Sequence, residues 1–276
     1  MKNFVLVFCV LLLTPFTLLA QEEEVGYNEN SVHPIHNSKQ LFKKRVWRRM
    51  DLNEKQNQPF FAVNNQITKF IIEAVQNGEL IPYDTDSVTD DRRISKEEFM
   101  SRLEIKTDAG GGDFGGWGDD GGDWGEGGAT ASAGPSKTYI RPDELNLLEI
   151  VEDAIFDNQR SRMYFDLQAI TVKIPADLTV NGLEGTLASF RYKDLEELFR
   201  AMPDKAQWYN MYNQSKSVNF ADAFLLRLFS ARIWKVNNPQ DEDLYSIYGG
   251  NPKRALYASQ QEEYKLMEYE HNLWEY

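Results

Sequence analysis

The sequence predicts an α+β protein with a small N-terminal helical unit, an acidic glycine-rich linker and a larger C-terminal α+β unit. Amphipathic helical spacing occurs before residue 105 and again at the C-terminus, and two strand-like runs surround a turn near residue 157. Glycines and acids separate the two halves. We therefore expect a signal peptide, an extended arm, a helical subdomain, a linker and an α+β subdomain, at residues 1–20, 21–45, 46–105, 106–137 and 138–276.

The N-terminus has the pattern of a secretory signal peptide. Lys2 precedes an apolar run from Phe4 to Leu13, and Leu-Leu-Ala ends at Ala20 before a run of acids. The apolar run is too short for a membrane span of roughly 20 residues, and Pro15 follows it closely. We expect cleavage after Ala20.

Composition limits both the chemistry and the partners. The only cysteine, Cys9, lies inside the apolar run, so the mature chain would have no disulfide, thiol nucleophile or lipid-attachment cysteine. With 30 Lys+Arg against 43 Asp+Glu the formal net charge is −13, which disfavours binding to nucleic acid or anionic lipid. We expect an exported protein that reaches a membrane only through another protein.

The helical unit rests on two patterns. Residues 64–80 have apolar side chains at helical spacing, and Gly78 is a suitable C-terminal stop. Ser95 and Glu98 are spaced as a capping box, which predicts a short helix after Ser95. The apolar positions of the first helix are Ile67, Phe70, Ile71, Ala74 and Val75.

The linker contains two glycine patterns that are known from binding sites. Residues 116–121 fit G-x-G-x-x-G, but neither a strand before them nor a helix after them supports a dinucleotide site. Residues 115–120 fit G-G-x-G-x-D, but the repeat that such a calcium site needs does not follow. An acidic linker is the simpler interpretation, in which the aromatic side chains of Phe114, Trp117 and Trp124 suggest docking on a surface.

The C-terminal unit is expected to contain a β-hairpin and three helices. The hairpin turns at Asp157 and Asn158, and Met163, Phe165 and Leu167 alternate along its second arm. A helix at 192–202 carries Leu195, Leu198, Phe199 and Met202, and another begins at Asn219 and passes into an extended run before Pro239. We expect that second helix to bury Phe220, Phe224, Leu225 and Leu228. The last twenty residues predict a terminal helix with one stripe of Tyr264, Met267, His271 and Trp274.

Catalytic and metal chemistry find little support in the sequence. His33 and His36 form an H-x-x-H pattern, but Pro34 lies within it, and the third histidine is in the terminal helix. No carboxylate pair can be singled out among 43 acids. We expect no enzyme, no cofactor and no metal.

Aromatic side chains are the remaining candidates for function. Most will fill the core, but Tyr, Trp, Met and Arg are also the residues that interface centres favour. Arg48, Arg49 and Arg191 supply guanidinium groups beside aromatic residues. Our interface candidates outside the linker are Trp208, Tyr209, Tyr212, Trp274 and Tyr276.

Four segments resemble the GldN family of gliding motility proteins, also called PorN. They are VWRRMDLNEKQNQPFF, SFRYKDLEELF, NFADAFLLRLFSARIWKVNNP and the ending ALYASQQEEYKLMEYEHNLWEY. The resemblance extends from about Val46 to Tyr276, while the glycine-rich segment looks like an insertion.

The resemblance implies a periplasmic structural subunit of the type IX secretion system, associated with the outer membrane through a partner. That subunit would self-associate in a ring with a GldK/PorK-like lipoprotein and contact the GldM/PorM-like motor protein. No catalytic residues come with the family. An exported carbohydrate- or peptidoglycan-binding module is the alternative, and an exported hydrolase is a third hypothesis for which no residue can be nominated.

Overall fold

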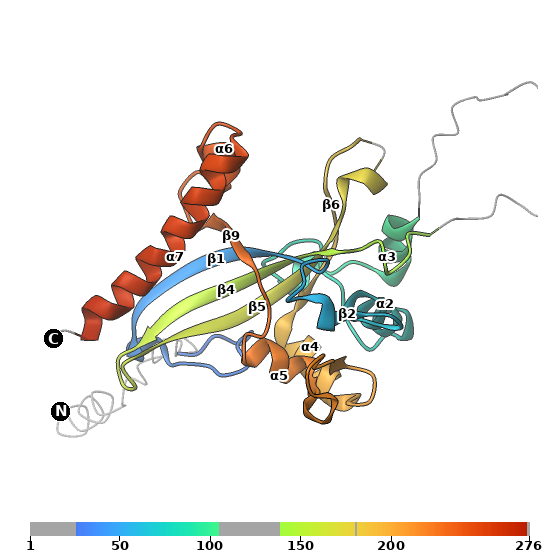
Figure 1. Cartoon of the computed structure of the whole chain (residues 1–276), viewed down its shortest axis with the longest axis horizontal. Helices are drawn as coiled ribbons and strands as arrows, with labels where there is room; N and C mark the ends of the chain where they lie inside the picture. The colour runs from blue at the N-terminus through green and yellow to red at the C-terminus, as the bar shows by residue number, and fades with distance from the viewer. Residues whose placement is uncertain (1–25, 105–138, 180, 275–276) are drawn as a thin grey trace, which may run out of the picture.

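A five-stranded antiparallel sheet organises the computed structural model, which describes residues 26–104, 139–179 and 181–274 (Figure 1). The strand order is β6-β5-β4-β1-β9, so the chain enters through an inner strand and finishes the sheet at its edge. The strands are β1 (Gln40–Asp51), β4 (Leu147–Asp157), β5 (Arg162–Ile174), β6 (Gly185–Arg191) and β9 (Arg232–Val236).

The predicted hairpin is confirmed as β4 and β5. Their register runs from Leu147 opposite Lys173 to Asp157 opposite Arg162, and it shifts by one residue after Val151. Both arms are rich in β-branched and aromatic residues, which favour the pleated surface of a sheet. The hairpin is the longest part of the sheet and provides its centre.

Strand β1 is the main difference from the sequence expectation. It pairs with β4 along its length and with β9 at residues 46–49. Residues 46–51, which we assigned to a helical unit, are therefore strand, and the expected boundary at residue 45 falls inside β1. Arginines in VWRRMD hide the strand pattern, because Arg48 is buried beside Val46 and Met50 on one face.

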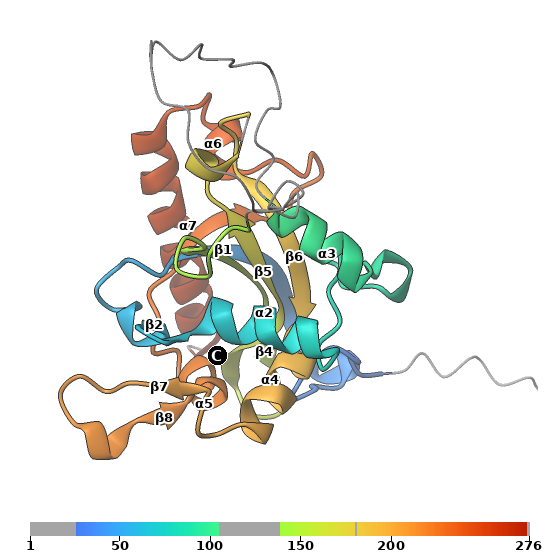
Figure 2. The same cartoon turned by 90° about the vertical axis from the view of Figure 1, so that its right-hand side faces the viewer.

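Four helices and the large hydrophobic core lie toward one end of the sheet (Figures 1 and 2). The helices predicted at these places are confirmed, and Gly78 adopts the left-handed conformation that ends the first of them. The side chains of Ser95 and Asn219 cap two others at the backbone N–H of Glu98 and Ala221. The helices are α2 (Ile67–Asn77), α3 (Lys96–Leu103), α4 (Tyr192–Ala201) and α5 (Phe220–Leu225).

Leu225 departs from its predicted burial. Helix α5 buries Phe220 and Phe224 as expected, and Leu228 is partly buried, but Leu225 is 54% exposed. The helix ends at Leu225, so the residue does not belong to the stripe that faces the core. Leu225 therefore lies at the surface beside the core, next to the exposed Leu226.

The predicted terminal helix is confirmed as α7 (Pro252–Trp274), which follows the short helix α6 (Leu244–Ile247). It crosses the sheet at the end away from α2–α5 and packs on a second, smaller hydrophobic cluster (Figure 1). None of the helices within the described residues combines the length and the apolarity that a bilayer crossing needs.

Short elements complete the described part of the chain. Two small hairpins, β2–β3 and β7–β8, lie outside the main sheet. They consist of β2 (Phe61–Ala62), β3 (Asn65–Gln66), β7 (Gln207–Trp208) and β8 (Val218–Asn219). The 3-10 turns are η1 (Asn37–Lys39), η2 (Gln58–Phe60), η3 (Asp90–Arg92), η4 (Ala176–Leu178) and η5 (Gln214–Lys216).

Candidate partner interface

Helix α7 is well defined by its own sequence. The Asn251 carboxamide oxygen accepts from the backbone N–H groups of Lys253 and Arg254, and Pro252 occupies the first helical position. No glycine or proline follows within the helix. The local sequence therefore encodes a long helix with a capped N-terminus. Which side of this helix faces the sheet depends on tertiary contacts.

The inner side of α7 makes a narrow apolar contact. Ala258 and Leu266 are buried against Val46 and Ala154 of the sheet. The ring of Tyr269 lies 4.2 Å from that of Phe42, centroid to centroid. Few side chains of this 23-residue helix are buried, so its attachment also relies on polar contacts.

Three polar contacts hold α7 on the sheet. The Glu262 carboxylate lies 2.8 Å from Lys44 Nζ, and the Glu263 carboxylate accepts from both terminal nitrogens of Arg48. Glu270 accepts from the backbone N–H of Met163 at 3.2 Å. The helix therefore touches β1 and β5, and these ties fix its rotation about its axis.

Arg48 belongs to a buried charge cluster between the two apolar cores. Glu152 lies between Arg48 and Arg227, and its carboxylate accepts from Arg227 Nη1 at 2.8 Å. Burial acts to lower the pKa of Arg48, but Glu152 and Glu263 outweigh it and hold that pKa above its ordinary value. Arg48 is thus an interior residue, and its guanidinium is not available for the interface role considered from the sequence.

The outer side of α7 exposes an aromatic row, which we call the α7 stripe: Tyr257, Tyr264, Met267 and Trp274. Their side chains are 58%, 66%, 56% and 61% exposed. The spacing of 7, 3 and 7 residues keeps them on one face of a helix. The sequence had grouped Tyr264, Met267, His271 and Trp274, and the structure turns that group toward solvent.

The predicted group around Trp208 forms a separate surface. Asn210 accepts from the backbone N–H groups of Tyr212 and Asn213, which shapes the loop between β7 and β8. Tyr212 is 90% exposed and Tyr209 is exposed as well. Trp208 packs against the main core instead, and its buried indole N–H has no acceptor among the described residues.

The structure does not bring the two predicted groups together. The β7–β8 hairpin lies beside α5 at the lower edge of Figure 2, whereas α7 crosses the other end of the sheet (Figures 1 and 2). Phe114, Trp117, Trp124 and Tyr276 lie outside the described residues. Trp274 is therefore the one candidate placed on the α7 stripe.

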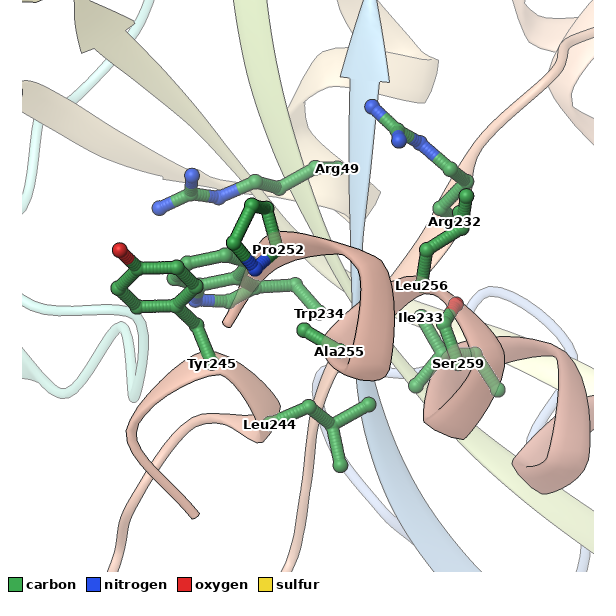
Figure 3. Close-up of a pocket in the computed structure, with 10 residues that line it drawn as sticks. All are labelled: Arg49, Arg232, Ile233, Trp234, Leu244, Tyr245, Pro252, Ala255, Leu256 and Ser259. Atoms are coloured by element: carbon green, nitrogen blue, oxygen red, sulfur yellow. The ribbon is translucent and has the colours of Figure 1, made fainter. Parts of the chain in front are cut away.

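A pocket beside the start of α7 is too small for a typical ligand site (Figure 3). The guanidinium of Arg49 stacks 3.4 Å from the centroid of Trp234, with Tyr245 and Pro252 nearby. The cavity holds about 180 Å³, below the 300–1,000 Å³ or so that is usual for small-molecule sites. We interpret the arrangement of Arg49 and Trp234 as a packed cation–π contact that supports the turn between α6 and α7.

The described residues contain no group of three or more His, Cys, Asp or Glu side chains placed to hold an ion. His36 lies edge-on to Tyr27 with ring centroids 4.9 Å apart, and its Nδ1 is 2.6 Å from the Ser38 hydroxyl. These contacts give His36 a structural setting.

Sequence reasoning missed two features of this region. Tyr257, Tyr264 and Met267 were not nominated as interface residues, although the 257–264–267–274 spacing opposite Ala258 and Leu266 could have indicated an outward stripe. The Arg48–Glu152 pair carries no local signal, because its partners are about a hundred residues apart in sequence.

Comparison with known proteins gives one family. The family model described as gliding motility associated protein GldN matches residues 35–275. No curated protein matches the chain.

Proposed function

The chain belongs to the family of gliding motility associated protein GldN, which is a component of gliding motility and type IX secretion, and we propose that it serves there as a non-enzymatic structural subunit. Its signal peptide would direct it to the periplasm. There it would self-associate in a ring with a GldK/PorK-like lipoprotein and contact a GldM/PorM-like motor protein. Its membrane association would then be indirect.

The observation that carries the structural role is the α7 stripe. A helix anchored from behind by ion pairs presents Tyr264, Met267 and Trp274 to solvent in a row. Aromatic and methionine side chains supply large contact area at interface centres. A helix in this arrangement suits docking into a groove of a partner protein.

Co-sedimentation with outer membranes tests this proposal. We expect the mature protein to sediment with membranes that contain the lipoprotein and to remain in solution with membranes that lack it. The Tyr264→Ala/Trp274→Ala double variant should weaken sedimentation by about tenfold, because two exposed anchors are lost. Tyr212→Ala is the control, since it removes an aromatic side chain that is 90% exposed and follows β7, away from α7 (Figures 1 and 2).

Two outcomes would contradict the proposal. Equal sedimentation without the lipoprotein would remove the partner-dependent role. A loss of sedimentation in Tyr212→Ala, with none in the α7 double variant, would move the contact away from α7. Circular dichroism of each variant shows whether the fold is preserved.

A cell-wall-binding module is the second candidate function, because the side chains of Tyr209 and Tyr212 are exposed. Aromatic side chains on a surface loop can stack on sugar rings. Retention on purified peptidoglycan that is lost in Tyr212→Ala would favour this function. Trp208→Ala is a poor probe for it, because Trp208 packs against the core.

A further inference from the structure

The α7 stripe is part of a longer heptad pattern. Gln260 and His271 are also exposed, and adding them gives six outward positions at alternating spacings of 3 and 4 residues. This is the spacing of the seam residues at positions a and d of a coiled coil. The outer face of α7 therefore has the pattern of a helix that packs along a second helix. The six seam positions are Tyr257, Gln260, Tyr264, Met267, His271 and Trp274.

The seam lies opposite the face that α7 uses to contact the sheet. An α-helix has about 3.6 residues per turn, so Ala258, Leu266 and Tyr269 share one side of α7 and the six seam positions share the other. Figure 1 shows α7 at the far end of the molecule from α2–α5, with no other described helix or strand beyond its outer side. A second helix can therefore approach the seam along its length.

Two exposed charges on one flank of the seam have no ion-pair partner. Over the described part of the chain, the ion pairs of α7 involve Glu262, Glu263 and Lys265 and leave Arg254 and Glu268 unpaired. Arg254 and Glu268 are two heptads apart, so they occupy the same flanking position near opposite ends of the seam. One end of this flank is thus positive and the other negative.

A flank of this kind is complementary to itself in an antiparallel pair. When two copies of α7 run in opposite directions, flanking positions of the same kind face each other across the seam. One register then places Arg254 of each copy opposite Glu268 of the other. Gln261, which is midway between them in sequence, faces its own copy on the two-fold axis. In a parallel pair the same two charges would lie about 21 Å apart along the axis and stay unpaired.

The same register also pairs the seam residues. It brings Tyr257 of one copy level with Met267 of the other, and Gln260 level with Tyr264. The two-fold axis repeats each of these contacts. Tyr257, Tyr264 and Met267 are each more than half exposed in the single chain, so all three lose water-exposed surface in the pair.

Repulsion between the two copies is limited. Glu263 is on the other flank and lies near its own copy at the axis, but its carboxylate accepts from both terminal nitrogens of Arg48 on the sheet side. The formal net charge of −13 also opposes association. At physiological ionic strength the screening length is about 8 Å, so the charges close to the seam dominate over those on the rest of the surface.

We propose that the α7 stripe is covered by the α7 stripe of a second copy of this chain, as an antiparallel pair of helices with its two-fold axis at Gln261. The inference rests on the proposed function for treating the stripe as an interface, and it names the occupant. A contact of this symmetry closes after two copies, so it joins subunits in pairs in addition to the contacts that build a ring. One helix pair covers less than the roughly 800 Å² per partner of a standard interface, so we expect a dissociation constant of about 10 μM.

Charge reversal tests both the orientation and the register. Arg254→Glu and Glu268→Arg should each weaken self-association of residues 21–276 about tenfold, because either change creates two like-charge contacts in the symmetric pair. An equal mixture of the two variants should associate as tightly as the parent, because each contact between unlike chains again joins opposite charges. Sedimentation equilibrium over a range of protein concentrations measures all four samples.

Lys216→Glu is the control, since it reverses an exposed charge in the loop between β7 and β8 and should leave self-association unchanged. Circular dichroism confirms that each variant is folded. A parent chain that stays monomeric at about 100 μM, ten times the expected dissociation constant, would overturn the proposal. A mixture that associates no better than the single variants would overturn it as well.

These measurements use purified protein without membranes, so they are separate from the test of the proposed function. A monomeric chain that still needs the lipoprotein and the α7 stripe to sediment with membranes would overturn the pairing and leave the proposed function standing. Pairing that is rescued in the mixture, together with sedimentation that is equal without the lipoprotein, would support the pairing and contradict the proposed function.

Discussion

Glu152 shows at the residue scale how charge is built into this fold. Its side chain is fully buried between Arg48 and Arg227, next to apolar clusters on either side. Burying an ion pair gains little by itself, but removing one partner leaves a charge in a poorly solvated place. The cluster is therefore a constraint on the fold more than a source of stability.

Replacing Glu152 by alanine is expected to lower the free energy of unfolding by about 3 kcal/mol, at the low end for a broken buried ion pair, because Arg48 keeps only its partly exposed partner Glu263. Urea denaturation measures the change. Glu73→Ala is the control, since its exposed pair with Lys69 is worth less than about 0.5 kcal/mol. The Arg48→Met/Glu152→Leu double variant should recover much of the loss, and a double variant as unstable as Glu152→Ala would contradict this account.

Asp166 makes stability depend on pH in the acid range. Burial raises its pKa from 3.8 to about 6, although Ser31 Oγ and Gln168 Nε2 donate to its carboxylate. Between these values the folded state holds a proton that the unfolded chain has released. Stability is therefore favoured by low pH and falls as the pH rises from about 4 through about 6.

Asp166→Asn should remove the loss of stability that accompanies the rise in pH. We expect the variant to be about 1–2 kcal/mol more stable than the parent near pH 7.5 and close to it near pH 4, since an amide does not ionise. Urea denaturation at both pH values gives the difference in free energy of unfolding between variant and parent. The contributions of the other titrating groups cancel in this difference. The same stability difference at the two pH values would show that ionisation of Asp166 is not the cause.

Helix α7 illustrates at the element scale how two faces of one helix can differ. Leu266 is buried against the sheet, while the adjacent Met267 is 56% exposed on the α7 stripe. Leu266→Ala should cost about 2 kcal/mol or more, and Met267→Ala less than about 0.5 kcal/mol. Hydrogen exchange of the α7 amides should accelerate in the first variant before the sheet is affected. Similar exchange in both variants would argue against the assigned faces.

The elements that could be predicted are those with local patterns. The helix with its stop at Gly78, the helix capped by Ser95 and the β4–β5 hairpin all follow from spacing within a few residues. Strand β1 could not, because Arg48 looks like a solvent-facing residue until Glu152 supplies its charge partner from β4. The orientation of α7 could not either, because apolar residues occur on both of its sides.

At the scale of the whole molecule, segments on both sides of the glycine-rich stretch form one sheet. Strand β1 precedes that stretch and β4, β5, β6 and β9 follow it, while the N–H of Ile140 donates to the carbonyl of Leu103 at 2.8 Å where the two segments meet. Deleting residues 110–134 should therefore change the free energy of unfolding by less than about 1 kcal/mol, since the cost of closing a loop depends weakly on its length.

Fragments provide the matching experiment. Residues 139–276 alone should not unfold cooperatively, because β4 would lack its neighbour β1, whereas co-expression with residues 26–104 should restore a cooperative transition. Gel filtration and circular dichroism follow the complex. A C-terminal fragment that folds by itself would instead support two separate units, as the sequence suggested.

The sequence by itself determined the α+β class, the helices and hairpin with local signals, and the resemblance to the GldN family that the family model confirms. Tertiary structure alone decided that β1 joins the hairpin, that Arg48 is interior, and that the row with Tyr264 and Trp274 faces solvent. The physical reason is that helix spacing and turn chemistry act between neighbours in sequence. Burial of a charge, or of one helix face, depends on partners that the chain brings together only on folding.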